Sequence, residues 1–393
     1  MSLSLLRSHL CRGKGEMAIL TLFVSLLAVT AIIFVLVLHG DGPITIAGLG
    51  NPFPTVAGPH ILRFPPPPDD DHRQEFSFHS PRPIMGIMQG RAQDGGGFAG
   101  QEQALPSASP GEPLPFVVLH GISDQCSNDG VSMFVDTLNR YVPGADGLCL
   151  HIGNGVEDSW LMPMRKQVDI ACKSIKRTPR LRNGFNLIGL SQGCLLGRAY
   201  IEWCTDGPPV HNYIAIAGPN AGTAAVPLCT DLFVCYFVNL LLQLGMYTKW
   251  AQNHVAPTGY VKIPSGMSSY LRGSRFLPYL NNEHRYARKR AYAHRFASLN
   301  RLVLIMFEQD RVIIPKETAW FGWYLPEDSV TRVVPVNETR LYKEDLIGLR
   351  SLDEAGKVVF VALPGGHLQL THAAIRDYVV PYLIMNSSSH SPR

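Results

Sequence analysis

Residues 184–204 read GFNLIGLSQGCLLGRAYIEWC, and we interpret the rest of the chain around them. Residues 185–190 form a short apolar run of strand length, and the segment after Gly193 repeats apolar residues near helical spacing. Gly189-Leu-Ser-Gln-Gly193 joins the two, and such a turn is typical of an exposed nucleophilic serine, here Ser191. We expect that side chains at its two glycine positions would collide with each other. The alternative is a glycine-rich turn whose serine only caps the helix.

The composition limits the class of protein. The chain has 393 residues, a hydrophobic content of 46% and a net charge of +4. This content is ample for a large core, and one α/β domain with insertions is as ordinary at this length as two or three domains. The basic excess is small and scattered, so we expect no nucleic-acid partner. The eight cysteines are enough for two or three supporting disulfides but too few for a disulfide scaffold.

The N-terminal segment predicts the compartment. Residues 1–16 form a basic tail that is expected to be cytosolic, and residues 17–38 are an uncharged apolar run about long enough to span a bilayer. Acidic Asp41 follows, which favours a lumenal location for the remainder. A transmembrane signal anchor is favoured over a long cleaved signal peptide, because no small-residue cleavage site directly follows the run. In either case the secretory pathway is expected, where disulfides persist.

Residues 39–113 lack a lasting periodic pattern. They contain a run of prolines followed by aspartates at 65–71 and three glycines at 95–97, so we interpret them as a disordered Pro/Gly-rich linker. The histidines of this segment have no metal-ligand spacing, and no metal site is expected. Residues 386–393 are interpreted as a C-terminal tail.

Residues 114–385 have the pattern of one folded domain. Apolar runs of strand length alternate with helical patterns, which predicts an α/β fold with a mainly parallel, doubly wound sheet. In such a sheet the reactive groups lie at the carboxyl ends of the strands. The predicted strands are 115–120, 147–151, 185–190, 212–217, 301–307 and 357–363, and the clearest helices are 128–142 and 164–176.

The alternation breaks at about 219–300. The apolar segment 232–246 is either a core helix or part of an inserted helical cap whose apolar face holds an apolar substrate. The basic residues that follow form either a solvated helix face or a surface for an anionic membrane or an acidic substrate. They are Arg285, Arg288, Lys289, Arg290 and Arg295.

Two residues downstream are candidates to activate Ser191. A serine hydroxyl is a poor nucleophile unless a base removes its proton and an acid orients that base. Asp310 and His367 each stand in a loop just after a predicted strand, at the sheet edge where Ser191 is expected. The order serine, acid, histidine is that of the α/β-hydrolases. Glu308 and Asp345 remain alternative acids.

Two backbone amides are the candidates for an oxyanion hole. One belongs to Ile122, which follows His120-Gly121 at the end of the first predicted strand. The other belongs to Gln192, directly after the serine. Removing one such donor typically costs roughly 10²–10³ in rate.

These residues together resemble the palmitoyl-protein thioesterase family over roughly residues 115–383. The resemblance implies the α/β-hydrolase fold and a serine hydrolase that removes palmitoyl groups from protein cysteines, with no metal or cofactor. It assigns the nucleophile to Ser191, the acid to Asp310, the base to His367 and the oxyanion contacts to Ile122 and Gln192. The motifs that carry it are His120-Gly-Ile-Ser-Asp124 with Cys126, Gly189-Leu-Ser-Gln-Gly193, Phe307-Glu-Gln-Asp310, Trp320-Phe-Gly-Trp-Tyr324, Leu341-Tyr342 and Gly366-His-Leu-Gln-Leu370.

The resemblance has further implications for cysteines and location. Cys172 with Cys204, and Cys229 with Cys235, match disulfides of the family. Family members act in the lysosome or an equivalent lumen such as the vacuole, on S-acylated proteins as partners, whereas an uncleaved anchor would hold this chain on a membrane. Asn337 and Asn386 begin sequons that would be glycosylated in that pathway.

The chain departs from the family pattern at two positions. Gly366 stands before the histidine where the family has an acidic residue. Cys126 is followed by Ser127 where the family has a second cysteine, so the resemblance leaves a bridge at Cys126 open. Two other functions remain open, a lipid esterase that uses the same triad on oxygen esters and a catalytically silent, membrane-anchored binding module.

Overall fold

The structure is a computed structural model that describes residues 113–224, 245–285, 289–325 and 332–384. All of them belong to the second of two units into which the chain divides, residues 1–56 and 57–393. Among the helices that these ranges contain, none has the length and apolarity needed to cross a bilayer. Outside the described residues lie the predicted membrane segment 17–38, nearly all of the predicted linker, segment 225–244 of the predicted cap, Cys229, Cys235 and Asn386.

Six parallel strands form the central sheet, in the order β2-β1-β3-β4-β5-β8. Parallel strands with helices on both faces are buried on both sides, which is why the strands read as continuous apolar runs. The strands are β1 (Phe116–Leu119), β2 (Leu148–Cys149), β3 (Phe185–Leu190), β4 (Val210–Ile216), β5 (Arg301–Phe307) and β8 (Val358–Leu363). The predicted parallel α/β sheet is confirmed.

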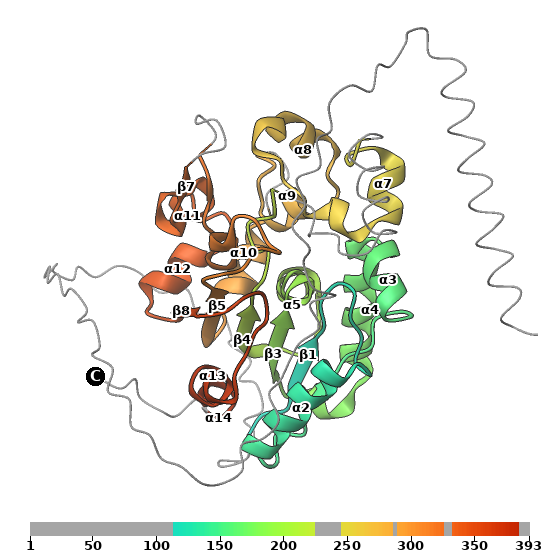
Figure 1. Cartoon of the computed structure of the whole chain (residues 1–393), viewed down its shortest axis with the longest axis vertical. Helices are drawn as coiled ribbons and strands as arrows, with labels where there is room; N and C mark the ends of the chain where they lie inside the picture. Colours follow the sequence, from blue (N-terminus) through green and yellow to red (C-terminus); the bar gives the residue numbers. More distant parts are fainter. Residues whose placement is uncertain (1–112, 225–244, 286–288, 326–331, 385–393) are drawn as a thin grey trace, which may run out of the picture. The chain divides into compact units, whose positions relative to one another are not determined.

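Helices cover both faces of the sheet (Figure 1). Alternate residues of one strand point to opposite faces. Leu302 and Leu304 of β5 therefore pack in one apolar cluster with α4 (Met164–Arg177), α5 (Gln192–Trp203) and α10 (Arg290–Ala297). Val303 and Ile305 pack in the other, with α2 (Asp129–Tyr141), α13 (His372–Tyr378) and α14 (Pro381–Ile384). The second cluster contains no residue of α5, which lies on the opposite face.

Short elements complete the described part of the chain. Between β2 and β3 lie α3 (Val156–Leu161), α4 and η1 (Pro179–Leu181); between β4 and β5 lie α7 (Lys249–His254), η2 (Ala256–Gly259), η3 (Pro264–Gly266), α8 (Met267–Gly273), α9 (Leu277–Leu280) and α10. Between β5 and β8 lie η4 (Lys316–Trp320), β6 (Trp323–Tyr324), β7 (Val333–Val334), η5 (Val336–Glu338), α11 (Arg340–Lys343) and α12 (Leu349–Glu354). The α-helices described between β4 and β5 are thus short, of four to eight residues each.

Within the part of the chain that the structure describes, two disulfides fasten helices and loops to this scaffold. Cys172–Cys204 joins α4 to the residue after α5, and the structure therefore contains the pair that the family resemblance implied. Cys126–Cys149 joins the segment before α2 to the end of β2. The sequence left a bridge at Cys126 open, and the structure supplies its partner because β2 pairs with β1 and brings Cys149 beside the segment that leaves β1.

The strand order identifies one edge of the sheet for ligand binding. The chain passes from β1 outward to β2 and then returns to β3 on the other side of β1. In open parallel sheets, ligands bind outside the carboxyl ends of the strands at such a reversal. The carboxyl ends of β1 and β3 lie in register, with Leu119 opposite Gly189, and Ser191 follows β3 there.

Candidate active site

Ser191 lies on a sharp turn between β3 and α5. Its φ of 52° and ψ of −119° are a conformation that L residues rarely adopt. A Cβ at Gly189 would lie 2.5 Å from Cys194 Cα, and one at Gly193 would lie 2.2 Å from the Leu119 carbonyl oxygen. Both positions therefore require glycine. The predicted reason needs correction, since Gly193 is confined by the end of β1 and not by a side chain at Gly189.

A continuous hydrogen-bond chain connects Ser191 with His367 and Asp310. His367 Nε2 lies 2.9 Å from Ser191 Oγ, and His367 Nδ1 lies 2.7 Å from Asp310 Oδ2. Because a carboxylate only accepts, Nδ1 carries the imidazole proton and Nε2 is left to accept the serine proton. The side chains of His367 and Asp310 are 7% and 1% exposed, so this chain is largely shielded from water.

The Asp310 carboxylate is held by its own loop. Its Oδ1 accepts backbone N–H bonds from Val312 at 2.8 Å and from Ile313 at 3.2 Å, which leaves Oδ2 for the histidine. The rival acids have other partners: Asp345 Oδ1 accepts from the Arg350 backbone N–H, and Glu308 meets the Gln309 side-chain amide at 3.5 Å. The structure therefore brings Asp310 alone of the three to His367.

The loop of His367 is attached to the loop of Asp310. The Gln309 backbone N–H donates to the Gly365 carbonyl at 3.1 Å, and the Gly365 N–H donates back to the Gln309 side chain. Gly366 stands where the family has an acidic residue, and a Cβ there would meet nothing nearer than 3.5 Å. A Cβ would therefore fit at this position, and His367 keeps its bonds to Ser191 and Asp310 with glycine there.

The amides of Ile122 and Gln192 lie at the same edge of the sheet. Ile122 follows β1, and Gln192 is the first residue of α5. Among the described residues, neither amide donates a hydrogen bond to another protein group. The loop after β1 packs directly on Ser191, since a Cβ at Gly121 would lie 3.1 Å from Ser191 Cβ. Free amides at a helix N-terminus favour an anion, so this pair is the candidate oxyanion hole.

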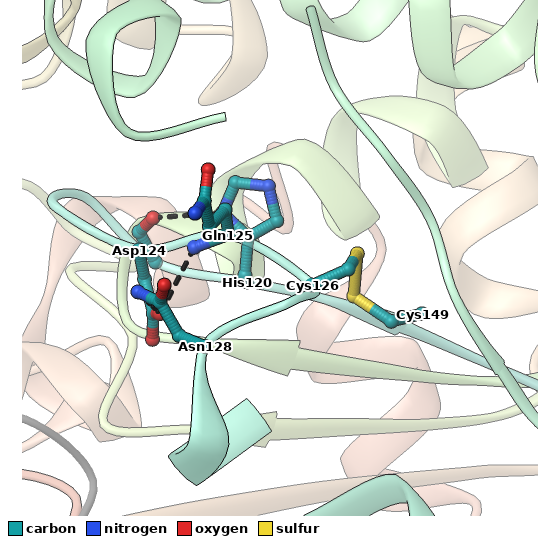
Figure 2. Close-up of a disulfide and its surroundings, with 7 residues drawn as sticks. His120, Asp124, Gln125, Cys126, Asn128 and Cys149 are labelled. Atoms are coloured by element: carbon teal, nitrogen blue, oxygen red, sulfur yellow. Dashed lines mark hydrogen bonds between the residues drawn. A yellow bond between two sulfur atoms is a disulfide. The ribbon is translucent and has the colours of Figure 1, made fainter. Parts of the chain in front are cut away.

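His120 is buried beside the same loop. Its Nδ1 lies 3.0 Å from the Gly121 carbonyl, which makes Nδ1 the protonated nitrogen. Burial lowers the pKa of His120, so the ring is held neutral. Figure 2 shows His120 with Asp124, Gln125 and Asn128 next to the Cys126–Cys149 disulfide. His367 therefore remains the candidate base, because its ring and not that of His120 is hydrogen-bonded to Ser191.

Sequence reasoning missed the residues that support the loop after β1, residues 120–124, which carries the candidate oxyanion amide of Ile122 and is called the oxyanion loop below. Ser159 and Trp160 of α3 hydrogen-bond to Ser123, and Tyr260 donates to the Gln192 side chain at 2.9 Å. None of the three belongs to a catalytic motif, and no spacing in the sequence relates α3 to the loop. In the described ranges, no group of three or more His, Cys, Asp or Glu side chains is placed to hold a metal ion.

Comparison with known proteins identifies the family. A family model described as palmitoyl protein thioesterase matches residues 115–367. Palmitoyl-protein thioesterase 1 of Caenorhabditis elegans is 33% identical over 69% of this chain and 92% of that protein. Palmitoyl-protein thioesterase 3 of Dictyostelium discoideum is 33% identical over 71% of this chain and 92% of that protein. The lysosomal thioesterase PPT2 homolog of Drosophila melanogaster is 29% identical over 68% and 91%, respectively. The matched region includes Ser191, Asp310 and His367, and the chain belongs to the palmitoyl protein thioesterase family.

Proposed function

We propose that this protein is a serine hydrolase that cleaves palmitoyl and other long-chain acyl thioesters from protein cysteines. The observation that carries the proposal is the hydrogen-bond chain from Ser191 through His367 to Asp310. Membership of a thioesterase family supports the reaction class, and the named relatives support an acyl-protein substrate.

Acylation begins with proton transfer from Ser191 Oγ to His367 Nε2 while Oγ attacks the thioester carbonyl. The carbonyl oxygen becomes an oxyanion, which the amides of Ile122 and Gln192 stabilise. Asp310 stabilises the imidazolium and keeps the ring in the productive tautomer. Collapse of the tetrahedral intermediate breaks the C–S bond and leaves the acyl group on Ser191.

The leaving group and water complete the cycle. A cysteine thiol has a pKa of about 8.5, so its thiolate leaves with less acid assistance than an alkoxide or an amine. The released cysteine takes the proton from His367. Water then attacks the acyl-enzyme as His367 again removes a proton, and the fatty acid departs as Ser191 is regenerated.

We propose that the enzyme recognises its substrate mainly through the acyl chain. At about 0.8 kcal/mol for each buried CH₂, a palmitoyl chain offers of order 10 kcal/mol before the costs of binding. A cavity of about 360 Å³ lies among described residues including Met267, Leu271, Phe321 and Trp323, but no triad residue lines it. The apolar segment 232–246 that the sequence predicts in the cap is the proposed groove for the acyl chain, and its residues 232–244 lie outside the described residues.

The proposed location is a lumen of the secretory pathway, in the lysosome or vacuole or on a membrane through residues 17–38. One relative is named a lysosomal thioesterase, and two disulfides support an oxidising compartment. Asn337 is exposed in η5, as a glycosylation site must be, while Thr339 of the same sequon accepts a hydrogen bond from the Tyr342 N–H. The proposed hydrolase domain is residues 114–385, with the cap at about 219–300.

The test compares a palmitoyl-thioester substrate with the matched oxygen ester, using wild type and Ser191→Ala. We expect the thioester to be cleaved faster, and the variant to lose a factor that approaches roughly 10⁶ in kcat. Faster turnover of the oxygen ester would establish a lipase instead. A folded wild type as inert as Ser191→Ala would establish a binding module.

A further inference from the structure

The loop that carries Ile122 depends on specific hydrogen bonds for its position. Ser123, the next residue, is exposed and has a φ of 60°, so burial does not hold this part of the loop. On the carboxyl side, Asp124 Oδ1 accepts from the Gln125 backbone N–H at 2.9 Å and from Asn128 Nδ2 at 2.7 Å (Figure 2). These bonds order the loop locally but do not connect it to the nucleophile.

The connection to the rest of the site is made by α3. The Ser123 backbone N–H donates to Ser159 Oγ at 2.9 Å, and Trp160 Nε1 donates to Ser123 Oγ at 2.7 Å. Two consecutive residues of α3 therefore hold both the backbone and the side chain of the residue next to Ile122. The helix itself is attached to α4, because the buried Gln167 donates to the Met162 carbonyl at 2.7 Å and to the Asp158 carbonyl at 3.1 Å.

Gln192, whose backbone N–H is the second proposed oxyanion donor, is tied to the same residue through its side chain. Gln192 Nε2 donates to the Ser159 carbonyl oxygen at 2.9 Å, and Gln192 Oε1 accepts from Tyr260. Ser159 thus meets the Ile122 loop through its hydroxyl and Gln192 through its backbone. Ser159 is buried, and its hydroxyl hydrogen is directed to the Val156 carbonyl at 2.6 Å, so a lone pair of Oγ is oriented toward Ser123.

We infer that Ser159 is a positioning residue that sets the distance between the two amides of the oxyanion hole. This inference rests on the proposed function, because the amides matter only if an oxyanion forms at Ser191. Donors must lie at the place that the oxyanion occupies in the transition state, and a displacement of about 1 Å can cost roughly 10²-fold in rate. Loss of the Ser159 contacts should therefore raise the energy of the transition state more than it weakens the binding of substrate.

The test is Ser159→Ala, which removes the bond to Ser123 and keeps the backbone bond to Gln192. We expect kcat to fall by about ten- to a hundredfold, with KM changed by less than about threefold. A long-chain trifluoromethyl ketone forms an oxyanion adduct with a serine nucleophile, and its affinity is expected to fall by the same factor as kcat. A non-hydrolysable thioether analogue of the substrate forms no oxyanion, and its affinity is expected to stay within about twofold.

Thr137→Val is the matched control. Thr137 is as buried as Ser159 but lies in α2, where its hydroxyl accepts only from the neighbouring Arg140 at 3.2 Å. We expect its kinetics to equal those of wild type.

Trp160→Phe is the second variant if Ser159→Ala fails to fold, and it removes the other bond to Ser123.

Two results would overturn the inference. One is a folded Ser159→Ala, or a folded Trp160→Phe in its place, whose kcat is within twofold of wild type. The other is an equal loss of affinity for the ketone and the thioether, which would show a general structural role. Failure of the proposed function is distinct, because it appears in the wild type itself, either as an inert protein or as faster turnover of the oxygen ester.

Discussion

At the scale of single residues, both oxygens of the Asp310 carboxylate have hydrogen-bond partners in the structure without substrate. Two backbone amides occupy Oδ1, so only Oδ2 faces the histidine. In Asp310→Asn the carbonyl oxygen would keep the two amides and the NH₂ group would face His367 Nδ1. The imidazole would then carry its proton on Nε2, where it cannot accept the serine proton. We expect kcat to fall by about 10⁴ with little change in KM.

Steady-state kinetics on a palmitoyl thioester would measure this effect, with Glu308→Gln as the control. Glu308 stands two residues earlier and has no bond to the triad. If Glu308→Gln lost as much activity as Asp310→Asn, the assignment of the triad acid to Asp310 would be wrong.

The buried carboxyl group of Glu202 should make the free energy of unfolding depend on pH. Glu202 and Arg198 of α5 are both 0% exposed and lie 3.8 Å apart. Burial raises the pKa of Glu202 to about 8, against the opposing effect of the Arg198 and Arg295 guanidiniums. Between pH 5 and pH 8 the unfolded carboxyl is ionised, whereas the folded one holds its proton. The folded state thus binds more protons, and its stability falls as the pH rises.

Urea unfolding of wild type and Glu202→Gln at pH 5 and pH 8 would isolate this group. We expect wild type to lose up to a few kcal/mol more than the variant between the two values. The comparison removes the opposite effect of His120, whose lowered pKa makes stability fall toward acid. Equal pH dependence in both proteins would mean that Glu202 is ionised when folded.

At the scale of elements, the two disulfides have different surroundings. Cys172–Cys204 joins α4 to the residue after α5, whereas Cys126–Cys149 lies two residues after Asp124 of the oxyanion loop (Figure 2). They close segments of similar length, with separations of 23 and 32 residues. Replacing either pair by serines is expected to cost about 3 kcal/mol of stability.

Only one of the two pairs is expected to affect the reaction. Under conditions where both variants are folded, Cys126→Ser/Cys149→Ser should lower kcat by about tenfold, because the loop that carries Ile122 loses an anchor. Cys172→Ser/Cys204→Ser should leave kcat within about twofold. Urea unfolding and initial-rate kinetics measure the two effects, and equal losses of kcat would contradict the difference in position.

The sequence predicts a feature well where the feature depends on residues close together in the chain. Gly189 and Gly193 are required by one turn, and Asp310 and His367 follow apolar runs that could be recognised as strands. The pairing of Cys126 with Cys149 could not be predicted, because it depends on β2 lying beside β1. Ser159 could not be found either, because its two contacts join a six-residue helix to segments more than thirty residues away on both sides.

At the scale of the whole molecule, the site is assembled from four strands of one sheet. The amides follow β1 and β3, and Asp310 and His367 follow β5 and β8. Because all four strands are parallel, their carboxyl ends lie at the same edge. Residues from positions 122 to 367 therefore meet at this edge of the sheet.

This arrangement predicts that residues 113–393 fold and act alone. Both apolar clusters and all four site-bearing strands lie in this part of the chain. A domain with its own core can fold independently, so kcat on a soluble acyl thioester should stay within about threefold of the full chain.

If residues 17–38 are an anchor, only the full chain should remain in the membrane pellet after alkaline carbonate extraction. Ser191→Ala in the shortened chain controls for contaminating activity, and an insoluble or inert fragment beside an active full chain would show that residues 1–112 belong to the fold.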